Sequence, residues 1–262
     1  MKLFKIFSVI LALTLCVQPA WGDNSAKDDP ISVSEQVHHA NVDTLKDYII
    51  KFHARGGAYI VLNTTTDKLA DKQFIEMPEG FEMWSNNATR LFDYAVGMHT
   101  GIIKDDEKII FNIGGIDLSK RIAKDDREAY LQPFYDNEHI APMKLLSAYI
   151  RLFKNSGGYL SETQLARLKS AVSENVKSGK AKRAKVEEYN VSGIASTTRK
   201  SDENYEVYTL FVGEFEANGQ NYALITVLDE PQPHKETYGF TTSGWNAVPL
   251  AAEIIKNIGK KQ

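Results

Sequence analysis

The sequence predicts an α+β fold, in which an antiparallel sheet is flanked by an N-terminal and a C-terminal helix. Apolar residues recur at helical spacing near both ends of the chain, over residues 37–52 and 250–258. Two β-rich segments, 207–215 and 222–228, are joined through Asn218-Gly219, a strong hairpin signal because both residues tolerate positive φ. Strands in both halves and helices at both ends favour one shared sheet with the helices packed on one face.

The N-terminal elements are predicted from caps and turn residues. Ser32 and Glu35 have the spacing of a capping box and predict a helix start, and Gly56-Gly57 predict its end. The β-prone run 58–62 predicts a strand, and a turn at 65–67 leads into a weaker strand near 72–76. Residues 80–140 show no sustained period, so no element is predicted there.

The C-terminal half gives clearer signals. Pro142 at a first helical position and a second capping box, Ser161 with Gln164, predict two consecutive helices that form a helical hairpin. A strand is predicted at 189–195, before the 207–228 hairpin. The closing helix is predicted to end at Gly259.

The first 22 residues are typical of a secretory signal peptide. Two lysines precede an uncharged run, residues 6–17, and small residues lead to a predicted cleavage after Gly22. Twelve residues make a helix of about 18 Å, short of the roughly 30 Å hydrocarbon core, so a permanent anchor is disfavoured. Two alternatives remain: an uncleaved leader and a lipoprotein acylated at Cys16. Membrane association is expected only if the leader is uncleaved.

The expected domain organisation follows from the leader. Residues 23–31 are polar and predict a flexible lead-in, and residues 32–262 are expected to form a single domain. Cys16 is the only cysteine and belongs to the leader, which suits an oxidising compartment. A bacterial periplasmic or secreted location is therefore expected.

Composition excludes several function classes. The 262 residues carry 31 Lys plus Arg and 34 Asp plus Glu, a net charge of −3, so no basic field for nucleic acid is predicted. One cysteine and six histidines without ligand spacing predict no metal site, and Gly114-Gly115 lacks the phosphate-loop pattern. No cofactor is expected.

Several collinear stretches resemble the transpeptidase domain of class B penicillin-binding proteins, which cross-link peptidoglycan. Residues 141–149, followed by Asn-Ser-Gly-Gly at 155–158, are similar to the family run T-P-x-Q-L-A-x-A-Y that ends in N-x-G-G. Residues 179–193 resemble the G-K-x-A-x-V-x-x-Y-x-V-x-G approach to the active-site strand. The closing D-E-P, Y-G-G and A-A-P-V elements are matched by residues 227–231, 238–239 and 247–249. The resemblance implies a transpeptidase/β-lactamase-like domain.

The family acylates a serine in S-x-x-K, where the lysine lies one helical turn later and activates the hydroxyl. No serine in this chain is followed by lysine three residues later. If residues 94–97 align with the family's Y-E-x-G, Met98 occupies the nucleophile position and Gly101 the lysine position. Only 96 residues then separate Met98 from Ile194, about half the family separation, which implies a reduced helical subdomain.

The family's K-T-G-T strand is also altered. Its lysine and hydroxyls bind the substrate carboxylate, and its glycine lets the acyl chain approach the backbone. The aligned residues are Ile194, Ala195, Ser196 and Thr197, with Lys200 trailing. The cation, one hydroxyl and the glycine are lost.

The family's S-x-N element has no match in register. Ser85-Asn86-Asn87 and Ser173-Glu174-Asn175 fit the letters at the wrong places. Lys177-Ser178-Gly179 resembles the strand motif, but it precedes the matched strand at a predicted helix end, so it is interpreted as a decoy.

The resemblance thus implies an inherited scaffold with a dismantled reactive centre, and no catalytic residue is expected. The predicted function is an exported pseudoenzyme that binds cell-wall or divisome proteins, or peptidoglycan, in wall synthesis or cell division. The alternative is an active D,D-transpeptidase-like or carboxypeptidase-like, penicillin-binding acyl-transferase with a rearranged site. Its candidate residues are Ser85, Ser196, Thr197 and Lys200.

Overall fold

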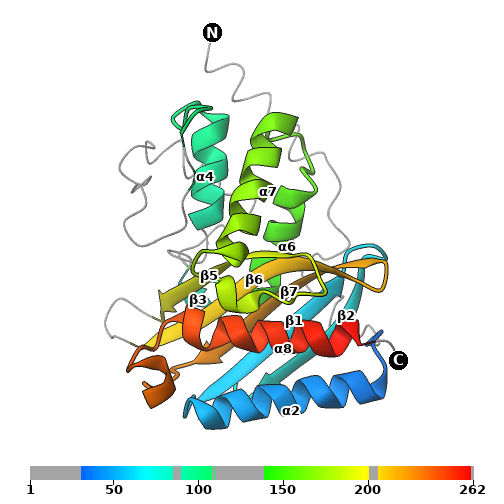
Figure 1. The fold of residues 1–262 in the computed structure, drawn as a ribbon, viewed down its shortest axis with the longest axis vertical. Helices are drawn as coiled ribbons and strands as arrows, with labels where there is room; N and C mark the ends of the chain where they lie inside the picture. The colour runs from blue at the N-terminus through cyan, green and yellow to red at the C-terminus, as the bar shows by residue number, and fades with distance from the viewer. Residues whose placement is uncertain (1–30, 85–89, 108, 110–138, 201–205, 261–262) are drawn as a thin grey trace.

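The computed structural model describes residues 31–84, 90–107, 109, 139–200 and 206–260 (Figure 1). The predicted signal peptide and residues 23–30 of the predicted lead-in lie outside these ranges. The core is a five-stranded antiparallel sheet in the order β2-β1-β7-β6-β5. Its strands are β1 (Gly56–Asn63), β2 (Lys68–Ile75), β5 (Val191–Arg199), β6 (Val207–Ala217) and β7 (Gln220–Asp229).

Helices cover both faces of this sheet. The helices α2 (Glu35–Lys51) and α8 (Ala247–Gly259) pack together on one face (Figure 1). The other face carries α4 (Arg90–His99), α6 (Pro142–Phe153) and α7 (Glu162–Lys177), beside a two-stranded ladder of β3 (Met83–Trp84) and β4 (His139–Ile140). The predicted α+β class, with an antiparallel sheet and terminal helices on one face, is confirmed. None of the helices in the described ranges is long and apolar enough to cross a bilayer.

Burial on both faces explains the composition of the central strands. All eight residues of β1 are buried. Successive residues of a strand point to opposite faces, so Ala58 and Ile60 enter the cluster under α4 and α6, whereas Tyr59 and Val61 enter the cluster under α2 and α8. A strand covered on both sides is apolar throughout, without hydrophobic and polar residues in alternation.

The predicted hairpin is present between β6 and β7. Asn218 and Gly219 adopt φ values of 53° and 71°, and Phe215 pairs with Tyr222 on either side of the turn. Strand β1 pairs antiparallel with β7, which joins the N-terminal and C-terminal parts of the chain into one sheet. The second capping box is also confirmed, since Ser161 Oγ accepts from Gln164 N and the Gln164 side chain accepts from Ser161 N.

The first helix starts later than its predicted cap. The N-cap is Ser34, whose hydroxyl accepts from Val37 N at 3.3 Å. The amides of Ser32 and Val33 both donate to Ala70 O, which holds this segment extended along β2. Ser32 is therefore occupied with the sheet and cannot cap the helix.

Helix α4, β3 and β4 lie in the stretch where no element was predicted. Every residue of α4 from Leu91 to Met98 is buried, the polar Asp93 included. The helix has only ten residues, fewer than three turns, which is too short a window for a helical period to be recognised. The strands β3 and β4 have two residues each, too few for an alternation to be recognised.

A buried carboxylate joins α2 to the sheet. Asp71 of β2 is fully buried, and its oxygens accept hydrogen bonds from Asn41 Nδ2 at 2.8 Å and the Tyr59 hydroxyl at 2.9 Å. His38 Nδ1 lies 2.7 Å from Asp71 Oδ1. Burial and the neighbouring Asp71 charge raise the pKa of Tyr59 far above its usual range, so the phenol remains a donor. A second link runs from Asn257 of α8 to Asn41, at 3.2 Å.

Removal of this carboxylate is expected to destabilise the fold. Asp71→Ala leaves the Asn41, Tyr59 and His38 groups without their acceptor, and we expect it to lower the free energy of unfolding by roughly 3–5 kcal/mol. Urea unfolding followed by circular dichroism measures the change. Asp43→Ala removes a carboxylate from an exposed pair with Lys46 and serves as the control, with an effect below about 1 kcal/mol. Equal effects of the two substitutions would contradict the role of Asp71.

Candidate functional site

Strand β5 carries the residues that align with the family's active-site strand, and it forms one edge of the sheet. It pairs with β6 in unbroken register from Val191 to Arg199. Ile194 belongs to the cluster under α4 and α6, whereas Ala195 packs against the cluster under α8. By alternation, Ile194, Ser196 and Thr198 face the helices α4, α6 and α7, where a transpeptidase cleft would have to open.

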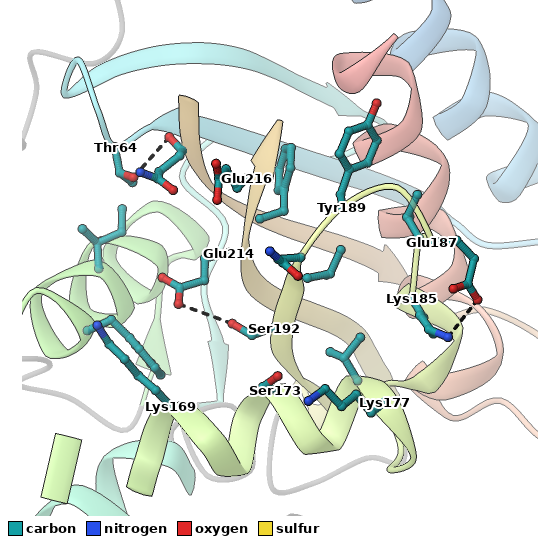
Figure 2. A pocket seen from close by; sticks show the side chains of 18 of the residues that line it. Thr64, Lys169, Ser173, Lys177, Lys185, Glu187, Tyr189, Ser192, Glu214 and Glu216 are labelled. Atoms are coloured by element: carbon teal, nitrogen blue, oxygen red, sulfur yellow. Dashed lines mark hydrogen bonds and ion pairs between the residues drawn. The ribbon is translucent and has the colours of Figure 1, made fainter. Parts of the chain in front are cut away.

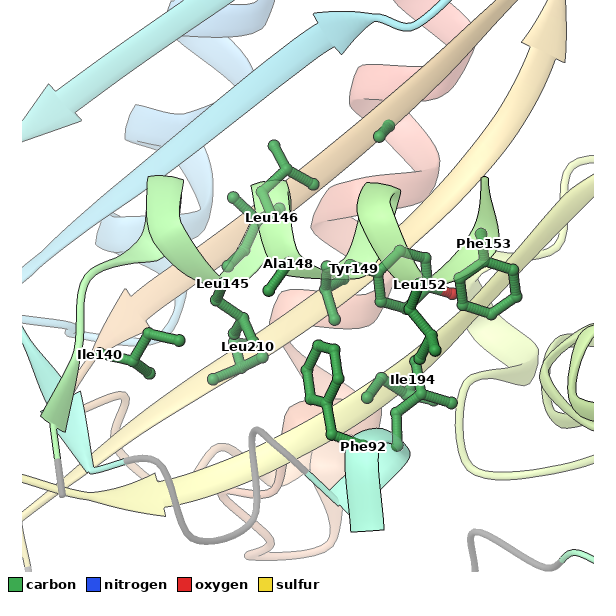
Figure 3. Close-up of a cluster of buried hydrophobic side chains, with 14 of the residues drawn as sticks. Phe92, Ile140, Leu145, Leu146, Ala148, Tyr149, Leu152, Phe153, Ile194 and Leu210 are labelled. Atoms are coloured by element: carbon green, nitrogen blue, oxygen red, sulfur yellow. The ribbon is translucent and has the colours of Figure 1, made fainter. Parts of the chain in front are cut away.

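Ile194 is built into the hydrophobic core. It is 4% exposed, and Figure 3 shows the Phe92 ring of α4 directed between Leu210 and Ile194. A branched aliphatic side chain here supplies packing where the family's motif supplies an ammonium group. This position offers a substrate carboxylate no cation.

Ser196 is placed on the same face but is not activated. Its residue is 4% exposed, and its Oγ has no hydrogen-bond partner within the described ranges. A serine nucleophile requires a base within hydrogen-bond reach. Two residues further on, the Thr198 hydroxyl donates to Trp84 O at 2.6 Å and ties β3 across β5.

Thr197 and Lys200 form hydrogen bonds and ion pairs with different parts of the fold, and within the described ranges they do not line a common cleft. Thr197 Oγ1 accepts from Ser243 N at 3.1 Å, which attaches the short helix η5 (Ser243–Trp245) to β5. Lys200 Nζ lies 2.5 Å from both Asp229 Oδ1 and Glu230 Oε1. Although burial disfavours its charge, the hydrogen bonds to these two carboxylates raise the pKa of Lys200. The residue is held as an ammonium in an ion cluster and is a poor general base.

The alignment of Met98 and Gly101 with S-x-x-K stays a prediction, and the two residues do not share a helical turn. That motif needs a helical turn between its two residues, but α4 ends at His99 and Gly101 adopts φ 73° in the turn that follows. Met98 is 1% exposed and its carbonyl accepts from Gln164 Nε2 at 2.8 Å. These positions form the end of a helix packed against α7, not the face of a catalytic turn.

The remaining residues that resemble family motifs lie in separate parts of the chain. Ser85 and Asn86 lie outside the described residues. On α7, Asn175 is buried and bridges to β5, because its Nδ2 donates to Gly193 O at 2.9 Å and its Oδ1 accepts from Lys180 N at 3.2 Å. Lys177-Ser178-Gly179 stands at the C-terminal end of α7, before β5, where the decoy interpretation expects it.

Comparison with known proteins rests on structure, since no family model and no curated protein matches the sequence. The transpeptidase domain of the D,D-transpeptidase FtsI4 from Legionella pneumophila matches with a TM-score of 0.62 at 15% identity, over 88% of this chain and 99% of that one. The TP domain of penicillin-binding protein 3 from Burkholderia pseudomallei matches with a TM-score of 0.68 at 13% identity, over 88% and 96%. The C-terminal domain of the BlaR penicillin-receptor from Bacillus licheniformis gives 0.61 at 12%, over 83% and 96%.

The chain has the penicillin-binding-protein transpeptidase fold. The predicted resemblance is confirmed at this level. Identities of 12–15% establish the fold and leave activity to be argued from the residues themselves. The reduction of the helical subdomain stays a prediction, because residues 110–138 lie outside the described ranges.

In this transpeptidase-like domain, the cationic residues Lys180 and Arg183 lie in the segment between α7 and β5. Burial, together with the positive charge of Arg90 at the start of α4, lowers the pKa of Lys180. Arg183 Cζ lies 3.6 Å from the ring centroid of Trp245 in η5. The sequence signals for them are the resemblance over residues 179–193 and a cluster of positive charges at 177–185. Within the described part of the chain, no group of three or more His, Cys, Asp and Glu is arranged to hold a metal.

Substitutions at Ile194 test whether the cleft position is filled. Ile194→Val should lower the free energy of unfolding by about 0.5–1.5 kcal/mol and Ile194→Ala by about 2–5 kcal/mol, because each removes buried methyl groups. Urea unfolding of the two variants checks this order. A loss below about 1 kcal/mol for Ile194→Ala is the result expected of a side chain in an open cleft, and it would contradict the filled site.

Proposed function

We propose that this chain is an exported, transpeptidase-like domain that forms no acyl-enzyme and acts as a binding or regulatory module in peptidoglycan synthesis or cell division. The observation that carries the proposal is the state of β5. Ile194 replaces the cation, and Ser196 is buried without a base among the described residues.

Energetic reasoning supports a non-catalytic role. When an activated nucleophile is removed, only substrate binding and oxyanion donors remain. They accelerate the reaction by roughly 10³-fold to 10⁴-fold over the rate in water. That residual catalysis also requires a groove for the substrate. Here the helix-facing side of β5 is occupied by Ile194 packed near Phe92 and by the Thr198 bond to Trp84. Among the described residues of this face, neither Ser196 nor Thr198 has a base as a hydrogen-bond partner.

The cellular setting is part of the proposal. The leader over residues 1–22 would direct the domain to the periplasm or the exterior of a bacterium. Cell-wall or divisome proteins, or peptidoglycan itself, are the proposed partners. One structural neighbour is described as a penicillin-receptor, so a domain of this fold also occurs in a protein named for binding.

Incubation with a fluorescent penicillin tests the proposal. We expect no covalent band on a denaturing gel, while an active penicillin-binding protein in the same experiment gives a strong band. The physical reason is that acylation needs a serine whose proton is removed by an adjacent base.

A covalent band would contradict the proposal and favour the acyl-transferase alternative. Ser196→Ala and Ser85→Ala would then identify the acylated residue by loss of the band. A band that survives both substitutions would indicate another nucleophile and would equally overturn a non-acylating function.

A further inference from the structure

A groove of about 700 Å³ lies between α7 and the sheet, near the start of β5 (Figure 2). It is bordered by α6 and α7 on one side and by β5 and β6 on the other. Val191 and Ser192 line it, whereas Ser196 and Thr198 do not. The groove is therefore separate from the aligned transpeptidase positions. Its volume falls within the range of about 300–1,000 Å³ that is usual for small-ligand sites.

The α7 wall of the groove is cationic. Lys169, Ser173 and Lys177 are spaced four residues apart, which places them on one face of the helix, and all three line the groove. Both lysines are exposed, and neither has an ion-pair partner within the described ranges. The helix presents two ammonium groups, carried by residues whose Cα atoms lie about 12 Å apart along its axis.

The sheet wall is acidic. Glu214 and Glu216 are two residues apart on β6, so both point to the same face, and both line the groove. Glu214 is half-buried, and the Ser192 hydroxyl donates to its Oε1 at 3.4 Å. Burial raises the pKa of Glu214, while Lys169 and the Ser192 hydrogen bond act in the opposite direction.

The two walls face each other without closing into an ion pair. Figure 2 shows Lys169 on α7 and Glu214 on β6, and the dashed bond from Glu214 runs to Ser192 and not to the lysine. Opposite charges that stay apart across a groove complement a ligand that carries both signs. Ser173 and Asn190 add polar groups that can bind amides in between.

We propose that this groove binds a short zwitterionic peptide, with its carboxylates against Lys169 and Lys177 and a free ammonium group against Glu214 and Glu216. The inference rests on the proposed function, since peptides with free amine and carboxylate groups are the class of ligand that a peptidoglycan-binding module would meet. It adds a ligand class and a site to that function.

Isothermal titration calorimetry with a synthetic Ala-Glu-Lys tripeptide tests the site. We expect saturable binding to the wild-type chain, and at least about tenfold weaker binding by the Lys169→Glu/Lys177→Glu double variant. Lys182→Glu reverses an exposed charge that does not line the groove and serves as the matched control, with less than about twofold change. The same peptide with acetylated and amidated ends should also bind at least about tenfold more weakly.

The source of the peptide is resolved by a second arm. The protein is pelleted with purified peptidoglycan sacculi, in which the peptides are attached to the polymer. This assay distinguishes a wall-bound ligand from a soluble one. The double variant should lose any pelleting that depends on the groove. Absence of tripeptide binding at 10 mM, or equal affinity of wild type and double variant, would overturn the inference. Unchanged urea midpoints show that each variant is folded.

This outcome is independent of the penicillin experiment. A penicillin band together with intact tripeptide binding would contradict the non-catalytic role and leave the groove assignment standing. No band and no tripeptide binding would overturn the groove assignment alone.

Discussion

Burial of the sheet on both faces is the constraint on which the rest of the structure depends. Strands β1, β7 and β6 are central, and residues 56–63, 223–229 and 208–213 of these strands are buried, so neither face can be left to water. Helices α2 and α8 cover one side, and α4, α6 and α7 cover the other. The Asp71 cluster and the Asn257–Asn41 bond connect the terminal helices to this arrangement through buried polar groups.

The same constraint accounts for the state of β5. In an active transpeptidase-like site the helix-facing side of this strand has to stay polar and open, which forgoes apolar burial and costs stability. Here Ile194 continues the core beneath Phe92, and Thr198 is bonded to Trp84. An edge strand that would line a cleft has become part of the packed interior. The groove beside Lys169 and Glu214 lies beyond that packed region, nearer the start of β5, where hydrophilic side chains remain.

Elements with local signals could be predicted from the sequence. The Asn218-Gly219 turn, the Ser161–Gln164 capping box and Pro142 each specify their element through short-range chemistry. Helix α4 could not be predicted, because its ten residues make fewer than three turns, too short a window for a helical period to be recognised. Ser34 replaced Ser32 as the cap for a tertiary reason, the pairing of the chain with Ala70.

The site was predictable in part. The substitutions at Ile194 to Thr197 could be read from aligned letters, but the burial of Ser196 depends on helices far away in sequence. Two matching letters, Tyr94 and Gly97, do not determine where a helix ends. Helix α4 ends at His99, just before the left-handed backbone of Gly101. The groove has no sequence motif, since only the packing of α7 on the sheet brings Lys169 and Glu214 to the same groove.

Thiol accessibility at residue 196 tests most directly whether the reactive centre is closed. In a Cys16→Ser background, which leaves no other cysteine, Ser196→Cys introduces a single thiol at the buried position, and Lys182→Cys introduces one at an exposed position. We expect the native Ser196→Cys protein to react with a thiol reagent at least about 100-fold more slowly than the Lys182→Cys protein, because labelling has to await local opening. Equal labelling rates of the two folded proteins would mean that an open cleft borders β5 and would contradict the account.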